Sequence, residues 1–309
     1  MRQPDFFFGI TPGDLIYDTE TYPNLFCIGF LHNETGLKWY FEISPTRNDI
    51  QKFIWFLSLL SVHGCRMVGF NNVNFDYPVI HMIFKHAHLG ISYKEIYDKA
   101  KAIIDSHGPA KFAHMVWESD YVVPQIDLFK IHHFDNPAKS TSLKMLEFNM
   151  RMDNIEDLPF TPNSKLLKWQ RESVAEYMWH DIKATRAFYK ESLEQIAMRE
   201  NLSETFGINM INMSDVKIGE TILTTEIQKA GIECYTVVDG KRKKRQTMRE
   251  KINLAEVIFP YVSFERSEFQ NILNSFRSKI ITETKGAFKD LCASVDGIMY
   301  KFGTGGLHA

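Results

Sequence analysis

Three short β-prone segments separated by compact turns stand near the start of this 309-residue chain. Residues 14–20, 25–31 and 37–43 are rich in Ile, Leu, Phe, Tyr and Thr. Tyr22-Pro23-Asn24 separates the first two segments, and a turn that ends in Gly36 separates the next two. Consecutive strands joined by short turns form a meander. The sequence therefore predicts that a three-stranded meander begins the fold.

The pattern after the meander changes to alternating helices and strands. Helices are expected at residues 46–60, 77–84, 142–149 and 164–199, and strands at residues 66–70 and 120–129. Pro78 fits the helix at 77–84 because proline is tolerated in a first helical turn. A meander followed by this alternation predicts an α/β fold, with a mixed β-sheet flanked by helices. The character changes near residue 200, so we expect a domain at 1–200 and a smaller α+β extension at 201–309.

Composition restricts the class of protein. Hydrophobic residues make up 44% of the chain and charged residues 24%, which is typical of a globular protein. The longest apolar run, Phe53 to Val62, is too short to span a bilayer, so no membrane association is expected. The four cysteines form no Cys-x-x-Cys pair, which argues against a zinc site or a disulfide framework. A net charge of −2 neither supports nor excludes a nucleic-acid partner, because only the local patch matters.

Four acidic residues and one tyrosine can converge on one cavity. Asp18 and Glu20 are two apart on an expected strand, so they share a face of the sheet. Tyr177 and Asp181 are four apart on an expected helix and share a face there. Asp76 stands just before an expected helix N-terminus, where an anion is favoured.

Clustered carboxylates repel one another and lose hydration, and divalent cations offset both costs. Two such ions can hydrolyse a phosphodiester. A second Tyr-x-x-x-Asp, from Tyr235 to Asp239, lies in β-prone sequence, where this spacing would separate the two side chains along a strand. The sequence therefore favours the copy at Tyr177, together with Asp18, Glu20, Asp76 and Asp181, as a site for two Mg²⁺ or Mn²⁺ ions.

The order of these segments resembles a known family. Gly69-Phe70-Asn71-Asn72-Val73-Asn74-Phe75-Asp76-Tyr77-Pro78 is similar to the second exonuclease motif of family B DNA polymerases. Ser142-Leu143-Lys144-Met145-Leu146 resembles a motif that contacts single-stranded DNA in the protein-primed branch. Residues 10–200 thus resemble the proofreading 3′–5′ exonuclease domain, which has the DnaQ-like, RNase H-like fold of the DEDD superfamily. Tyr177 implies the DEDDy subtype; the DEDDh subtype has a histidine where this chain has Glu176.

The resemblance implies a role for each residue. Asp18 would bridge two cations, Glu20 and Asp181 would complete the site of the attacking water, and Asp76 would help to hold the second ion. Tyr177 would orient that water. Further residues would contact the DNA 3′ end: Thr21 and Asn72 at the terminal nucleotide, Phe75 or Leu25 against a splayed base, and Ser142 and Leu143 on the single strand.

The rest of the chain has a weaker resemblance to phage-type polymerases. Ser214-Asp215-Val216-Lys217-Ile218-Gly219-Glu220 and the glycine-rich end at 303–309 resemble the stretch between the exonuclease and polymerase domains. The known polymerase motifs are not present, so no polymerase activity is expected from this chain. The resemblance implies a proofreading fragment of a viral replicative polymerase, acting on single-stranded DNA or a primer 3′ end in an infected bacterial cytoplasm. The polymerase would then be a partner in cis or in trans.

Two other functions stay open at this point. The same carboxylates would serve an exonuclease that prefers RNA, selected by a contact to the 2′-hydroxyl. A non-catalytic module could instead hold DNA or a partner through the basic run at 241–245. A binding module needs no carboxylate cluster, so the acidic residues favour an enzyme.

Overall fold

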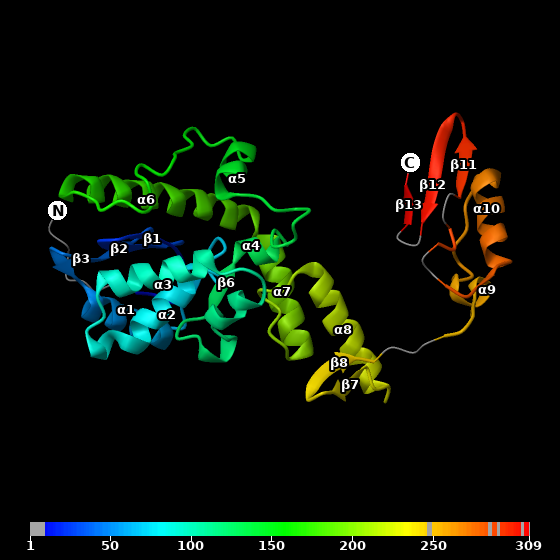
Figure 1. Ribbon diagram of the computed structural model, residues 1–309, viewed down its shortest axis with the longest axis horizontal. Coiled ribbons are helices and arrows are strands. Elements are labelled where there is room, and N and C mark those ends of the chain that lie inside the picture. Colours follow the sequence, from blue (N-terminus) through cyan, green and yellow to red (C-terminus); the bar gives the residue numbers. More distant parts are fainter. Residues whose placement is uncertain (1–9, 246–248, 284–285, 289–290, 304–305, 309) are drawn as a thin grey trace. The chain divides into compact units, whose positions relative to one another are not determined.

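The computed structural model describes residues 10–245, 249–283, 286–288, 291–303 and 306–308 (Figure 1). The chain forms two compact units, Met1–Glu226 and Ile227–Ala309. Helix α7, Leu193–Phe206, continues past residue 200, where the sequence suggests a change of domain. Thr304, Gly305 and Ala309 of the glycine-rich end lie outside the described residues.

A six-stranded mixed sheet organises the first unit, which confirms the expected α/β class. Its strands lie in the order β4-β3-β2-β1-β5-β6. The first three strands pair antiparallel as the expected meander, whereas β5 pairs parallel to β1 and β6 pairs parallel to β5. The strands are β1 Asp14–Tyr22, β2 Leu25–His32, β3 Lys38–Ser44, β4 Arg47–Asn48, β5 Arg66–Gly69 and β6 Gln125–Asp127.

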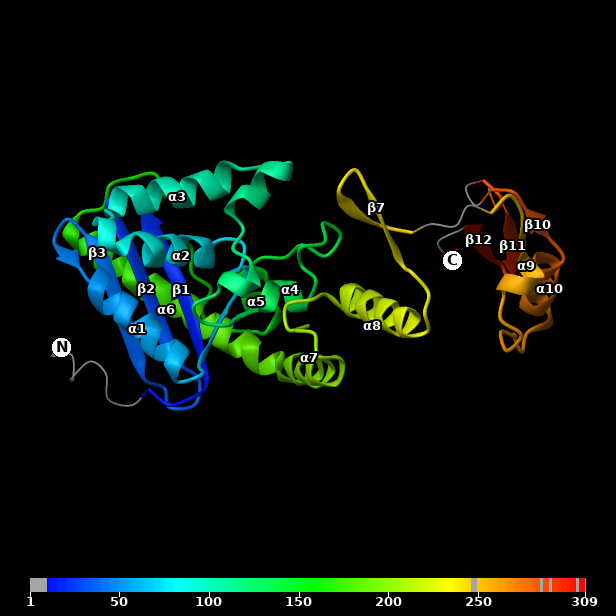
Figure 2. The same ribbon diagram turned by 90° about the horizontal axis from the view of Figure 1, so that it is seen from below.

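Helices cover both faces of this sheet. Figure 1 shows α6 on one face and α1, α2 and α3 on the other, and Figure 2 shows the same layers from below. Alternate side chains of the strands point to opposite faces of the sheet and pack in two separate apolar clusters, one under each layer of helices. The helices are α1 Ile50–Val62, α2 Asp76–His86, α3 Tyr93–Asp105, α4 Leu128–Ile131, α5 Leu143–Asn149, α6 Lys168–Glu191, α7 and α8 Asp215–Lys229.

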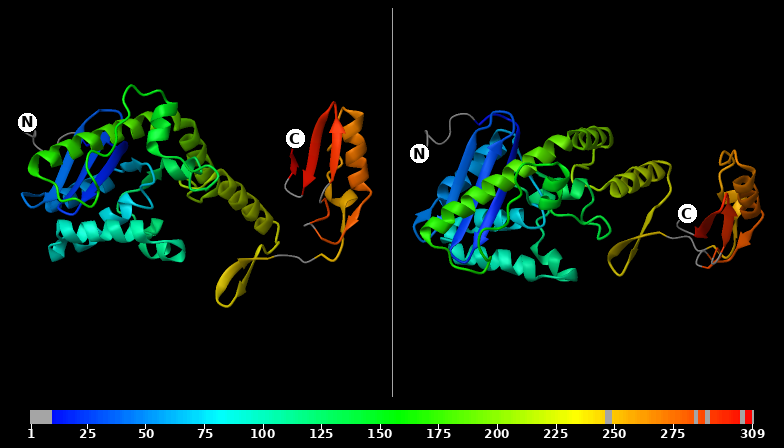
Figure 3. Two further views of the ribbon diagram at one scale, coloured as in Figure 1. Left: turned by 45° about the horizontal axis from the view of Figure 1, so that its top comes forward. Right: turned by 90° about the horizontal axis from the view of Figure 1, so that it is seen from above.

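One glycine lets α6 approach the sheet closely. Gly29 on β2 pairs directly with Asp18 on β1. A Cβ atom at this position would lie 2.6 Å from Met178 Cε and 2.7 Å from Ile182 Cδ1, both on α6. A larger residue would require the ends of these two side chains to move. The glycine therefore leaves room for α6 side chains above β2, beside the strand that carries Asp18, and Figure 3 shows this helix crossing β1 and β2.

Three expected boundaries are wrong, each for a local reason. The helix expected from residue 46 starts at Ile50, because Arg47 and Asn48 pair with β3 as β4. The strand expected at 120–129 shrinks to β6, because Asp127 caps the N-terminus of α4. The helix expected at 164–199 starts at Lys168 and ends at Glu191, and α7 follows after Ser192. Ser192 is fully buried, and its hydroxyl contacts Phe188 O and His132 Nε2, each at 2.8 Å.

The second unit contains small sheets and short helices, which confirms the smaller α+β extension. Strands β7, Tyr235–Val238, and β8, Lys241–Lys244, form a hairpin whose turn residues Asp239 and Gly240 both have positive φ. Tyr235 thus lies on a strand, as expected. The remaining elements are β9 Ile252–Asn253, α9 Leu254–Val257, α10 Ser267–Arg277, β10 Ile280–Ile281, β11 Cys292–Val295, β12 Ile298–Gly303 and β13 Gly306–His308.

None of the helices in the described ranges combines the length and apolar character that crossing a lipid bilayer requires.

Candidate metal centre

Three of the expected carboxylates meet between β1 and α6. One oxygen from each of Asp18, Glu20 and Asp181 lies within 4.8 Å of the others. Asp18 and Glu20 share the sheet face of Ile16, which packs in the apolar cluster under α6. Asp181 comes from α6 itself. The alternation along β1 and the position of α6 therefore place these carboxylates together, as the sequence predicts.

The electrostatics of this group indicate a shortage of positive charge. Burial raises the pKa of Asp18 well above its ordinary value, and the carboxylates of Asp76, Asp181 and Glu20 raise it further. Burial and the nearby Asp181 and Asp76 act on the pKa of Glu20 in the same direction. Burial raises the pKa of Asp181 to about 6. A divalent cation among these oxygens would reverse the effect, because it stabilises the ionised form.

Asp76 lies beside this group and is not one of its three members. It is the first residue of α2, only 6% exposed, and its Oδ1 accepts a hydrogen bond from Thr19 Oγ1. Burial raises the pKa of Asp76 to about 7, although the Thr19 hydrogen bond lowers it. Its carboxylate nevertheless raises the pKa values of both Asp18 and Glu20. Asp76 is therefore close enough to interact electrostatically with both carboxylates.

Tyr177 lies one helical turn before Asp181 on α6, and only 9% of its surface is exposed. Its phenol hydrogen-bonds the Asp181 carboxylate, which partly offsets the rise in the pKa of Asp181. Burial, together with the Asp181 and Glu20 carboxylates, raises the pKa of Tyr177. The phenol thus stays protonated and can donate a hydrogen bond at the carboxylate group.

Two of the expected substrate contacts carry buried polar atoms without a partner. Thr21 Oγ1 and Asn72 Oδ1 are both buried and form no hydrogen bond with any residue that the structure describes. The side-chain amide nitrogen of Asn72 donates a hydrogen bond to Gln125 Oε1 at 3.1 Å, so it is the side-chain oxygen that has no partner. A Cβ atom at Gly69 would lie 2.7 Å from Asn72 Cβ, so a glycine allows the close turn after β5. Orphaned buried polar atoms are uncommon and indicate a ligand or solvent partner.

The other expected contacts have different surroundings. Leu25 is fully buried in the apolar cluster under α6, and its contact with a base stays a prediction. Phe75 is partly buried against the opposite cluster. Ser142 is exposed and caps α5, accepting a hydrogen bond from Met145 N at 3.2 Å. Leu143 follows it, half-buried, on the first turn of α5.

Asp127 supports the turn that carries Asn72. Its carboxylate is fully buried and accepts hydrogen bonds from Asn71 N at 2.9 Å and Val73 N at 3.2 Å. Asn71 has a φ of 60°, and these bonds stabilise that conformation. Asp127 therefore orders the loop between β5 and α2.

Sequence reasoning missed two side chains near Asp181. Glu147 on α5 and His180 on α6 form a group with Asp181, whose ligand atoms also lie within 4.8 Å of one another. His180 directly precedes Asp181 on α6, and neighbouring positions of a helix point to different sides, so its place in the sequence gives no sign of this contact. The 33 positions between Glu147 and His180 leave no local signal for their contact.

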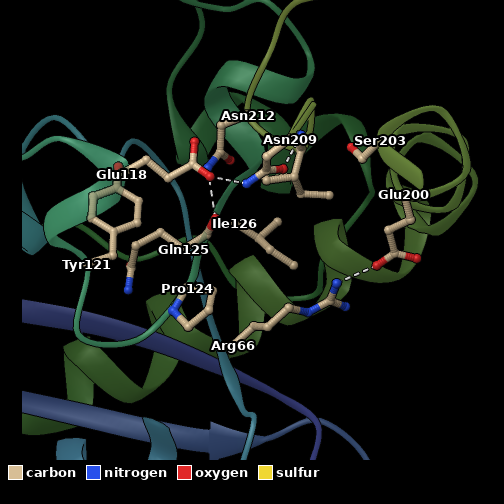
Figure 4. Close-up of a pocket in the computed structure, with 11 residues that line it drawn as sticks. Arg66, Glu118, Tyr121, Pro124, Gln125, Ile126, Glu200, Ser203, Asn209 and Asn212 are labelled. Carbon is tan, nitrogen blue, oxygen red and sulfur yellow. Dashed lines mark hydrogen bonds and ion pairs between the residues drawn. The ribbon is translucent and has the colours of Figure 1, made fainter. Parts of the chain in front are cut away.

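A separate cavity of about 390 Å³ opens at the other end of the parallel strands (Figure 4). Its lining includes Arg66 and Gln125, which begin β5 and β6, and Asn212. The Asn212 amide donates to Gln125 O and its oxygen accepts from Asp127 N, both at 2.8 Å, so this side chain covers the free edge of β6. The carboxylate group lies beyond the opposite ends of these strands and does not line the cavity.

Comparison of the sequence with protein-family models and with curated proteins finds no match.

Proposed function

We propose that the chain is a metal-dependent 3′–5′ exonuclease that shortens DNA from its 3′ end. The observation that carries the proposal is the meeting of Asp18, Glu20 and Asp181 beside the protonated phenol of Tyr177. An all-oxygen donor set suits Mg²⁺ or Mn²⁺. Such ions would lower the pKa of an attacking water and stabilise the departing 3′ oxygen.

The residues of the chain would hold and orient the reactants. Asp18, Glu20 and Asp181 would hold the cations, with Asp76 beside them. Tyr177 would orient the water against the phosphorus through its hydroxyl, whose oxygen can accept a hydrogen bond from the water while its hydrogen stays directed at Asp181. The water loses one proton to solvent as its oxygen forms a bond to phosphorus. The bond to the 3′ oxygen of the preceding nucleotide breaks, this oxygen takes a proton from solvent, and a nucleoside 5′-monophosphate leaves. Thr21 and Asn72 offer unpaired polar atoms for the terminal nucleotide.

The sequence resemblance supports a narrower proposal about biological role. The chain would be the proofreading part of a viral replicative DNA polymerase in an infected bacterial cell, with the polymerase domain in cis or in trans. Unpaired 3′ ends would be preferred, because mismatched bases are easier to separate from the template.

The test uses 5′-labelled oligonucleotides of one sequence, as DNA and as RNA, with the 3′ end free or blocked. The proposal expects a ladder of shortened DNA in Mg²⁺ or Mn²⁺, no shortening in EDTA, and protection by the 3′ block. Asp18→Asn should abolish the ladder. Faster shortening of RNA would assign the site to RNA instead. Tight DNA binding without shortening in either metal would identify a binding module and contradict catalysis.

A further inference from the structure

A second group of potential ligands shares Asp181 with the proposed catalytic centre. His180 Nε2 lies 2.9 Å from Glu147 Oε2, and one oxygen of Asp181 completes the group. Glu147 comes from α5, whereas the other two residues are neighbours on α6. The group thus joins two helices that are separate in sequence.

Glu147 carries the observation that indicates a ligand. Its side chain is only 1% exposed, and one carboxylate oxygen is directed at His180. The other oxygen, Oε1, is buried and has no hydrogen-bond partner among the residues that the structure describes. A carboxylate without full compensation is costly in such surroundings. A cation bound to this carboxylate would supply the missing partner.

The net charge of the group would also favour binding of a cation. Glu147 and Asp181 contribute two carboxylates, and His180 contributes at most one positive charge. Lys144 forms an ion pair with Asp157, and its charge also lowers the pKa of Asp181. The other ring nitrogen of His180, Nδ1, lies 3.7 Å from Glu156 Oε1. Binding a metal through Nε2 would replace its hydrogen bond to Glu147 and would move the ring hydrogen to Nδ1, where the Glu156 carboxylate can accept it after a small rotation.

We propose that Glu147, His180 and Asp181 form a second cation site, which selects a divalent transition-metal ion such as Zn²⁺ over Mg²⁺. Imidazole nitrogen with carboxylate oxygens suits Zn²⁺, whereas Mg²⁺ takes oxygen ligands only. Ligands about 2.1 Å from zinc lie about 3.4 Å apart in tetrahedral geometry. The three atoms already lie within 4.8 Å of one another, so small side-chain rotations would bring them into range.

The site would attach α5 to α6 beside the catalytic carboxylates. Helix α5 begins at Leu143, directly after its capping residue Ser142, and these are the two residues expected to contact single-stranded DNA. Asp181 has two oxygens and can serve both groups. The bound ion would therefore hold the DNA-contacting end of α5 in a fixed relation to Asp181.

The test measures Zn²⁺ binding to the full chain by calorimetry, after EDTA treatment and dialysis. The starting protein carries Asp18→Asn and Glu20→Gln, which break the first group and leave Glu147, His180 and Asp181 intact. We expect one Zn²⁺ per chain and Mg²⁺ affinity at least about 100-fold weaker. Adding His180→Gln or Glu147→Gln should weaken Zn²⁺ binding at least about 10-fold. Glu176→Gln, at an exposed position of α6, is the matched control and should leave the affinity unchanged.

Nuclear magnetic resonance of the histidine rings provides a readout that does not depend on how the additional variants fold. Zn²⁺ should shift an Nε2 signal of one of the 11 histidines in the Asp18→Asn/Glu20→Gln protein. No ring shift, no Zn²⁺ binding to this protein, or equal affinity in folded His180→Gln and Glu147→Gln variants would overturn the proposal. Binding is independent of DNA hydrolysis: Zn²⁺ bound by a wild-type chain that cannot shorten DNA would contradict the exonuclease proposal alone.

Discussion

Asp14 and Asp18 lie four residues apart on the same face of β1, and their surroundings are opposite. Asp14 receives two hydrogen bonds from the Arg66 guanidinium, at 2.6 and 2.8 Å, and a third from Tyr189 Oη at 2.6 Å. Asp18 is surrounded by Glu20, Asp76 and Asp181, which raise its pKa. One end of the strand thus contains a complete ion pair, whereas at the other end burial and neighbouring carboxylates raise the pKa of Asp18 and Glu20.

This difference separates a structural carboxylate from a functional one. A buried acid that holds the fold together is paired with a base within the chain, as Asp14 is. A group of acids held together by the fold, with too few bases beside them, is stabilised by a cation from solution or by protonation. Substitutions at the two ends of β1 should therefore have opposite consequences for activity and stability.

The largest expected effect is on activity. Asp181→Asn should lower the rate of DNA shortening in Mg²⁺ at least about 10³-fold, equivalent to about 4 kcal/mol, because it removes a shared cation ligand. Asp14→Asn should keep most of the activity at temperatures where circular dichroism shows it folded. Equal losses in the two variants would contradict the distinction between the two ends.

The next effect concerns pH in the absence of metal. Asp76 has a pKa of about 7 in the folded chain, against an ordinary 3.8. A carboxyl with a raised pKa stabilises the fold fully below its unfolded pKa, and this contribution is lost as pH rises through the folded value.

Stability in EDTA should therefore fall between about pH 4 and about pH 8. Asp76→Asn should remove about 4 kcal/mol of that fall, since the pKa difference is about 3 units and each unit is worth about 1.4 kcal/mol. Urea unfolding of both proteins across this range measures it. An identical pH profile in the variant would show that the pKa of Asp76 is not raised in the folded chain.

A smaller effect is expected at Tyr177, which acts on the water and does not hold a cation. Tyr177→Phe removes the phenolic hydroxyl and should lower the rate constant for shortening about 10²-fold, or about 2.7 kcal/mol. Mn²⁺ affinity, measured by electron paramagnetic resonance, should stay the same. Weaker Mn²⁺ binding would instead assign the hydroxyl to maintaining the geometry of the carboxylates.

The smallest effect is on the stability contributed by the Asp14 ion pair. Asp14→Asn should destabilise the fold by about 2 kcal/mol, below the value for a fully buried pair because Arg66 keeps 34% of its side chain exposed. Asp18→Asn should do the reverse in EDTA and raise the melting temperature. Destabilisation of the metal-free chain by Asp18→Asn would contradict the comparison.

Local patterns predicted much of the fold and of the site. The meander followed from β-prone segments and short turns, and the pairing of Asp18 with Glu20 followed from the two-residue period of a strand. The Tyr177–Asp181 spacing likewise depended only on helix geometry. Leu25 lies on the same face of the sheet as Ile16, in the cluster under α6, and its local sequence did not reveal that its side chain is fully buried there.

Contacts between distant segments could not be predicted in this way. Arg66 pairs with Asp14 across 52 positions, and Asn212 covers the edge of β6 from a loop 85 positions away. The Glu147–His180 contact requires α5 to pack on α6, which no short pattern encodes. Such contacts depend on tertiary packing, and here they distinguish the paired end of β1 from the unpaired one.

Anomalous diffraction from crystals soaked in Mn²⁺ would locate an ion at either end of β1. We expect a Mn²⁺ peak between Asp18, Glu20 and Asp181, no peak at Asp14, and loss of the peak in Asp18→Asn crystals. A fully soaked wild-type crystal without a peak at these three carboxylates would contradict the proposed metal site.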